Sequence, residues 1–115
     1  MDTVIVAQQI TMDEIKKLAV YWFGDFVKAV VDLDLQIMAV GGELHADQEA
    51  ILLARQSKQE NLWGINLYPE QPIADWIEFD SMINVRPSGG NRSRHVEQAE
   101  IRETITTIVN RLVKE

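Results

Sequence analysis

The chain has 115 residues, of which 46% are hydrophobic, and this size suits one hydrophobic core and is too small for two. We therefore expect residues 1–115 to form a single domain. The formal net charge of -7 disfavours broad attraction to nucleic acid or to an anionic membrane, because both need a basic protein surface. Any contact with RNA would have to be local.

The absence of cysteine excludes disulfides, thiolate nucleophiles and thiolate metal sites. The apolar stretch from Val4 to Ala7 is too short for a secretory signal. No run approaches the roughly 20 apolar residues that a membrane-spanning helix needs. The sequence therefore predicts a cytoplasmic protein without a membrane anchor.

Two helices are predicted from capping signals and from apolar periodicity. Thr11 can cap a first helix with Glu14 as its capping-box partner, and Gly24 can end that helix in a left-handed conformation. A last helix is predicted from about Gln98 to Lys114, because its apolar residues recur at helical spacing. These residues are Ile101, Ile105, Ile108, Val109 and Leu112.

Four strands are predicted after a short extended segment at Val4 to Ala7. Residues 26–31 and 37–40 are rich in β-branched types, and their close spacing favours an antiparallel hairpin. Residues 62–68 form the third strand, and the fourth begins at Trp76. The apolar face of the fourth strand consists of Ile77, Phe79, Ile83 and Val85, and its polar face consists of Glu78, Asp80, Asn84 and Arg86.

The segment from His45 to Gln56 is the most ambiguous one. Its Ala, Leu and Gln content and the early Asp47 favour a short helix, whereas a strand at Ala50 to Leu53 is the alternative, so residues 47–55 stay open. With either choice, the pattern predicts an α+β fold. We expect about four mostly antiparallel strands in a sheet that packs on one face against two or three helices.

Three sequence blocks, GGELHAD, LWGINLYPE and WIEFDSMINVRPSGGNRSR, followed by VEQAEIRETI, resemble a family of small bacterial proteins classified as a domain of unknown function. The blocks follow the same order, and the resemblance spans nearly the whole chain. It implies a compact stand-alone domain. It implies no activity, no cofactor and no catalytic residue.

The first candidate site is the loop from Arg86 to Arg94, which contains three of the six arginines and no acidic residue. Glycines let backbone N–H groups surround an oxyanion, and arginine pairs with phosphate or carboxylate through two hydrogen bonds. The alternative is an ordinary turn whose arginines pair with surface carboxylates. The predicted ligand-binding residues are Arg86, Ser88, Asn91, Arg92, Ser93 and Arg94.

The second candidate is acidic. Glu78 and Asp80 lie two residues apart on a predicted strand and hence on one face. Two neighbouring carboxylates can share a divalent cation or separate their pKa values for acid–base work. An internal salt-bridge ladder with Arg86 is the commoner outcome for such a pattern, so we predict no dedicated metal site.

The third candidate is His45, which shares a face with Glu49 if the segment is helical, and with Asp47 as well if it is extended. Either arrangement could contribute to a metal site of histidine and carboxylates. The alternative, which we prefer, is that Asp47 caps a helix and His45 is a satisfied loop residue.

Three functional hypotheses follow from these candidates. The first is a binding module for a small anionic ligand, a nucleotide or phosphorylated metabolite, held by the arginine loop. The second is a metal-dependent, hydrolase-like enzyme that uses Asp80 and Glu78, with or without His45. The third is an interaction subunit that docks on an acidic protein or RNA or forms a homodimer through an exposed edge strand. The sequence indicates no particular cofactor.

Overall fold

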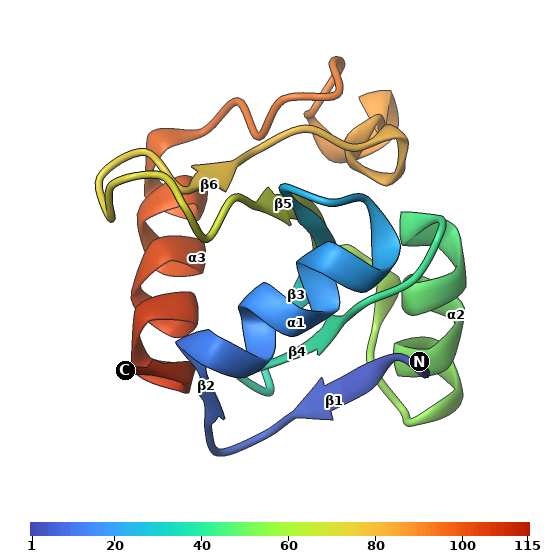
Figure 1. Cartoon of the computed structure of the whole chain (residues 1–115). Helices are drawn as coiled ribbons and strands as arrows, with labels where there is room; N and C mark the ends of the chain where they lie inside the picture. Colours follow the sequence, from blue (N-terminus) through green and yellow to red (C-terminus); the bar gives the residue numbers. More distant parts are fainter.

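The computed structural model describes residues 1–115 and contains a five-stranded antiparallel sheet with three helices around it (Figure 1). The strand order is β1-β4-β3-β5-β6, and β2 and β7 form a separate parallel pair. The strands are β1 (Val4–Val6), β2 (Ile10–Thr11), β3 (Val27–Asp32), β4 (Ile37–Val40), β5 (Leu62–Leu67), β6 (Ile77–Glu78) and β7 (Val113–Lys114). The predicted hairpin is confirmed, because β3 and β4 pair antiparallel with Ala29 opposite Val40.

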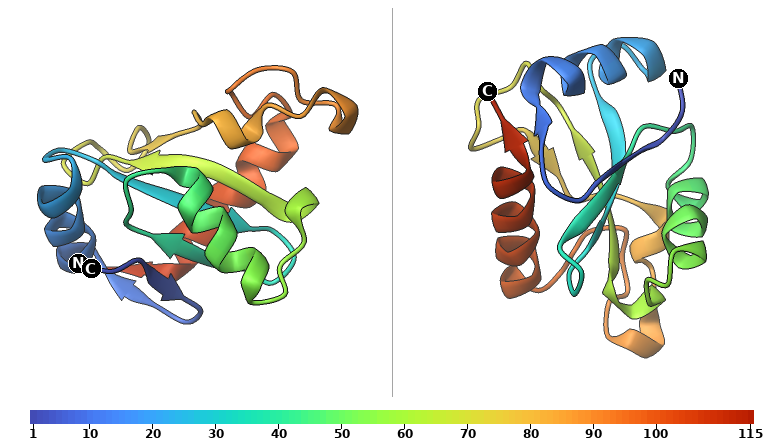
Figure 2. Two further views of the ribbon diagram at one scale, coloured as in Figure 1. Left: turned by 90° about the vertical axis from the view of Figure 1, so that its right-hand side faces the viewer. Right: turned by 90° about the horizontal axis from the view of Figure 1, so that it is seen from below.

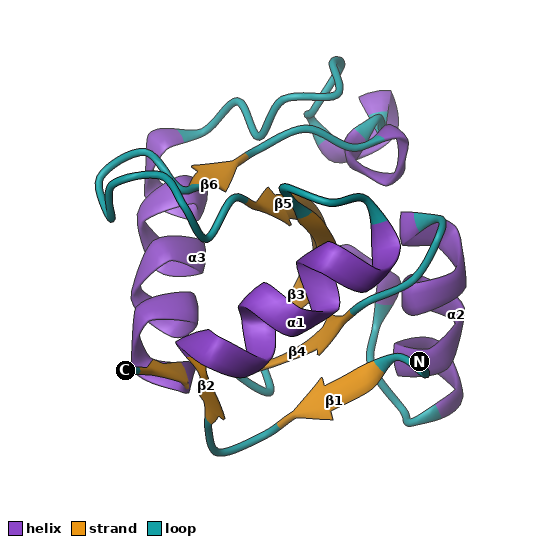
Figure 3. Ribbon diagram, in the orientation of Figure 1, coloured by secondary structure: helices purple, strands orange, loops and turns teal.

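The helices are α1 (Met12–Trp22), α2 (His45–Ala54) and α3 (Ala99–Leu112), and three short 3-10 turns accompany them. The turns are η1 (Gln59–Asn61), η2 (Met82–Asn84) and η3 (Pro87–Gly89). Figure 3 shows that mostly loop connects β6 to α3 and that η2 and η3 interrupt it. None of the helices has the length and apolar character needed to cross a membrane.

The predicted start and end of α1 are confirmed. The Thr11 hydroxyl accepts a hydrogen bond from the Glu14 amide at 3.1 Å, and the Glu14 carboxylate accepts one from the Thr11 amide at 3.5 Å, which completes the capping box. Gly24 follows the helix with φ of 97°, in the left-handed region where glycine is favoured. The local sequence therefore determines both ends of this helix.

The ambiguous segment is helical, and α2 spans His45–Ala54. The prediction that Asp47 caps this helix is wrong: the N-cap is Leu44, and Asp47 lies in the first turn. His45 is accordingly a helix residue and not a loop residue. Because Leu44 has no polar side chain, no side-chain cap is present at this helix end.

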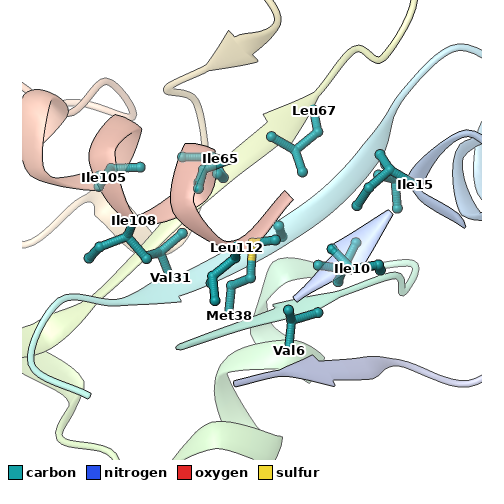
Figure 4. Packing of buried hydrophobic residues seen from close by; sticks show 14 of the residues in the cluster. Val6, Ile10, Ile15, Val31, Met38, Ile65, Leu67, Ile105, Ile108 and Leu112 are labelled. Atoms are coloured by element: carbon teal, nitrogen blue, oxygen red, sulfur yellow. The ribbon is translucent and has the colours of Figure 1, made fainter. Parts of the chain in front are cut away.

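Hydrophobic residues cover both faces of the sheet. The larger cluster, shown in Figure 4, packs α1 and α3 against one face through residues such as Ile15, Ile105 and Ile65. A smaller cluster on the other face packs Leu52 of α2 against Leu62. Figure 2 shows α2 and α3 on opposite sides of the sheet. The α+β class is thus confirmed, but the expectation that helices cover only one face is wrong.

The fourth strand is much shorter than predicted. β6 ends at Glu78, and Ile83 lies in the turn η2 instead of in the sheet. Asn84, expected on a polar face, is fully buried, whereas Val85, expected in the core, is 37% exposed. The Ser81 hydroxyl accepts a hydrogen bond from the Ile83 amide at 3.2 Å, which stabilises the turn in place of a strand. The last helix also ends earlier than predicted, because residues 113–114 form β7.

Candidate functional site

The segment from Ser81 to Glu97 is held on the sheet by the side chain of Asn84. β3 pairs with β5 on one side of Gly64, but β6 ends before it reaches Gly64, so no strand lies on the other side. The Asn84 carboxamide takes that place: it accepts a hydrogen bond from the Gly64 amide at 2.8 Å and donates one to the Gly64 carbonyl at 3.0 Å. It also donates to the Arg94 carbonyl at 3.0 Å. Asn84 therefore connects the loop to the sheet edge.

Asn91, a predicted ligand-binding residue, is buried and its polar atoms bind the chain itself. Its amide nitrogen donates to the carbonyls of Asn84, Ser93 and His95 at 2.8 to 3.0 Å. Its side-chain oxygen accepts from the Glu97 amide at 2.9 Å. These contacts fix the shape of the loop and leave no polar atom of the Asn91 side chain without a partner.

Arg86 also points inward. Its guanidinium lies 4.2 Å from the centre of the Trp63 ring and donates to the carbonyls of Leu62 and Ile83. A further hydrogen bond reaches the Gln59 carbonyl at 3.2 Å. Burial lowers the pKa of Arg86 from its usual value. In this position Arg86 links the loop and the start of η1 to β5.

The predicted anion-binding backbone of the loop holds a carboxylate of the same chain. The Glu97 side chain accepts hydrogen bonds from the amides of Arg92 and Ser93, the shorter at 3.0 Å. Hydrogen bonds from Ser93 and then from Arg92 lower the pKa of Glu97. Ser88, Arg92 and Ser93 are exposed.

Arg94 pairs with the carboxylate of Asp80. Its Nε donates to Oδ1 of Asp80 at 2.7 Å and its Nη2 donates to Oδ2 at 3.2 Å, which leaves Nη1 without a partner. The hydrogen bond from Arg94 lowers the pKa of Asp80 from its usual value. Both side chains remain partly exposed.

A cavity of about 220 Å³ lies between the start of α2 and the segment that contains η2. In Figure 1 the first turn of α2 lies directly below this segment. Polar groups from four elements line the cavity, and apolar side chains form its remaining walls. The polar residues are Lys28, His45, Ser81 and Arg94, and the apolar ones are Leu44, Ala46, Met82 and Ile83.

His45 is the most buried ionisable group of this cavity, with 8% of its surface exposed. Its Nε2 lies 2.8 Å from the Ile65 carbonyl oxygen. Because a carbonyl only accepts, Nε2 must carry the hydrogen. Burial lowers the pKa of His45 from 6.5 to about 4, and the positive charge of Lys28 contributes to the lowering. The ring is therefore neutral at pH 7, and Nδ1 has a lone pair that no protein group uses.

The predicted acidic pair does not form a shared site. Glu78 accepts hydrogen bonds from Asn66 at 2.8 Å and from the Tyr68 hydroxyl at 3.4 Å, whereas Asp80 binds Arg94. Nowhere does the structure assemble three or more His, Asp or Glu side chains that could hold a metal ion. The negative charge of Asp80 does act on His45: it raises the pKa of His45 and so opposes the larger lowering by burial.

Two of the predicted site residues, His45 and Arg94, thus meet in one cavity, and Asp80 lies beside it. Lys28 and Ser81 were not among the predicted site residues. Lys28 is the only cation of the strand VKAVVD and interrupts its run of apolar residues, and this break is the signal that could have identified it. Ser81 carries no comparable signal, because serine before a turn is ordinary.

The protein is thus a small α+β fold with a pocket of mixed polar and apolar lining at the N-terminus of α2. The model of the family described as "Protein of unknown function (DUF5674)" matches residues 4–112, and the chain belongs to this family. No curated protein and no solved structure matches the chain.

Proposed function

We propose that the protein binds a small anionic ligand, such as a nucleotide or a phosphorylated metabolite, in the cavity at the start of α2. The observation that carries the proposal is that two cationic residues, Lys28 and Arg94, and the polar residue Ser81 line one cavity. These groups come from separate parts of the chain, so packing of any single element does not account for their meeting.

The donors of the cavity suit an oxyanion. Arg94 retains a free Nη1 after its two hydrogen bonds with Asp80, and charge-assisted hydrogen bonds of this kind are the strong ones. The first-turn amides of α2 have no side-chain cap, and a helix N-terminus attracts negative charge. The cavity is smaller than the roughly 300 Å³ of a typical drug-sized pocket, so we expect it to enclose only the anionic group of a larger ligand.

This proposal moves the binding site from the outer surface of the arginine loop to its inner side. Of the six loop residues predicted to bind a ligand, only Arg94 lines the cavity. Arg86 and Asn91 bind the chain itself, and Ser88, Arg92 and Ser93 are exposed residues that do not line it.

The test is calorimetric titration with inorganic phosphate and a panel of nucleotides at low ionic strength. Arg94→Ala and Lys28→Ala should each weaken binding about tenfold, since each removes a charge-assisted hydrogen bond. Arg92→Ala is the matched control: it removes the same charge from the same loop but lies outside the cavity, so binding should be unchanged. Equal weakening by Arg92→Ala and Arg94→Ala would contradict the proposed site, as would the absence of any binding.

Asp80→Asn separates this proposal from a hydrolase in which Asp80 holds a metal. Asp80 is a negative charge that occupies Arg94, so its neutralisation should tighten anion binding. In a metal-dependent enzyme the same substitution would weaken metal and substrate binding instead. The direction of the change in affinity therefore distinguishes the two functions.

A further inference from the structure

The neutral histidine of the cavity limits which anions can bind. This inference rests on the proposed function and concerns the same cavity. The residue His45 is 8% exposed, its Nε2 is bound to the Ile65 carbonyl at 2.8 Å, and its Nδ1 has no partner within the protein. Solvent reaches Nδ1, because it does not belong to the buried polar atoms without a partner. A ligand that displaces solvent from Nδ1 must supply a hydrogen-bond donor in its place, or it loses affinity.

We infer that the cavity selects a phosphate group that still carries a proton, with the P–O–H hydrogen donated to Nδ1 of His45. The remaining phosphate oxygens then accept hydrogen bonds from Lys28, Ser81 and Nη1 of Arg94. A tetrahedral anion suits these donors because they come from three separate parts of the chain, namely β3, the segment at η2 and the arginine loop. A planar carboxylate has only two oxygens, and neither carries a hydrogen when it is charged.

Sulfate is the matched probe for this inference. It has the tetrahedral shape of phosphate but carries no proton between pH 4 and 8, so its oxygens can only accept hydrogen bonds. A sulfate oxygen next to Nδ1 of neutral His45 would bring two hydrogen-bond acceptors together with no hydrogen between them, which is unfavourable. A site built around a hydrogen bond rejects an analogue that lacks the hydrogen strongly.

The pH dependence of sulfate binding adds an independent readout. His45 faces the charges of Lys28 on β3 and of Asp80 and Arg94 on the loop. Burial, followed by Lys28, keeps the pKa of His45 near 4, so the ring becomes a donor at Nδ1 only in acid. Sulfate affinity should therefore rise as the pH falls towards 4, whereas the preference for phosphate should shrink.

The experiment measures the affinity of the full chain for inorganic phosphate and for sulfate at pH 6.5 and at pH 4.5, at equal ionic strength. At pH 6.5 phosphate should bind at least about tenfold more tightly than sulfate, and at pH 4.5 the ratio should fall. His45→Gln should remove the preference while both anions still bind, since a carboxamide can turn either a donor or an acceptor to the ligand. Circular dichroism checks that the variant is folded.

Equal affinity for the two anions at pH 6.5 in the parent chain would overturn the inference about the proton and leave the anion-binding proposal standing. Binding of neither anion at either pH would overturn both. Because the comparison of phosphate with sulfate uses the unmodified chain, the result does not depend on how His45→Gln folds.

Discussion

At the edge of β5, side chains supply hydrogen bonds that a neighbouring strand would otherwise supply. The carboxamide of Asn84 binds both the N–H and the C=O of Gly64, as a neighbouring strand would. Arg86 donates to the Leu62 carbonyl on the same strand. Buried polar networks of this kind specify one arrangement only when every member is satisfied. These contacts within the protein account for Asn84, Arg86 and Asn91 of the block INVRPSGGN, so no ligand is needed to explain those residues.

His45 should make the stability of the protein depend on pH. Its pKa is about 4 in the folded chain and about 6.5 when unfolded, so the unfolded state binds the proton first as the pH falls. Stability is therefore lost between about pH 6.5 and 4, by up to about 3 kcal/mol from this group. Urea unfolding at pH 7 and 4.5, in buffers without phosphate, measures the loss.

The matched variant for this measurement is His45→Gln, which removes the titrating group. Carboxylates such as Asp80 also contribute to acid destabilisation, because their lowered pKa favours the charged form in the folded state. The readout is therefore the difference between the two proteins, and His45→Gln should show the shallower loss. Parallel pH profiles would show that His45 is not buried as described.

At the scale of elements, the sequence predicts those parts whose signals are local. The capping box at Thr11 and Glu14 and the apolar period of residues 101–112 identify α1 and α3. Runs of β-branched residues identify β3 and β4. In each case the residues that form the sequence pattern also make the stabilising interaction, either the helix cap or the packing of the apolar face. The locations of these elements were correct for that reason.

The fourth strand and the cavity depend on contacts that are distant in sequence. Residues 77–85 alternate as a strand would, yet the chain turns at Ser81 because it packs against Gly64 of β5. Lys28 and Arg94 line one cavity although 66 positions separate them in the numbering. A sequence pattern does not show which distant segment will pack against β5 or complete the lining of the cavity. His45 and Arg94 could be named from their residue types, but their meeting could not be.

Gly64→Ala tests this packing of the turn on β5. A Cβ atom at position 64 would lie 2.5 Å from the Cβ of Ser81, so the turn would have to move away from the strand. We expect a loss of about 1 to 3 kcal/mol in the free energy of unfolding, which is typical of overpacking. Urea denaturation measures it. Gly89→Ala is the control, because Gly89 is exposed and has no positive φ, and its effect should stay within about 0.5 kcal/mol.

The same substitution should weaken phosphate binding, because Ser81 and Arg94 belong to the segment that would move. A Gly64→Ala protein as stable as the parent would show that the turn does not rest on β5 in this way.

At the scale of the whole molecule, one sheet separates two clusters of different size. The larger contains 19 buried residues and the smaller contains 4. The small cluster is too limited to stabilise α2 independently, since isolated helices of this length are marginal in water. The start of α2, which lines the cavity, therefore depends on the sheet that the larger cluster stabilises.

We propose that residues 1–115 form a single domain, and we therefore expect the chain to unfold as one cooperative unit. Leu52 belongs to the small cluster and Ile105 to the large one, and both are fully buried. Leu52→Ala should cost about 2 to 5 kcal/mol and Ile105→Val about 0.5 to 1.5 kcal/mol of unfolding free energy. In both variants, urea curves followed by tryptophan fluorescence and by far-ultraviolet circular dichroism should coincide, because Trp63 and α2 lose their structure together. The contrary result would be a Leu52→Ala protein that loses helical signal at a urea concentration where the fluorescence of Trp63 and Trp76 is still native. In that case α2 would unfold separately, and the cavity could open without unfolding of the sheet.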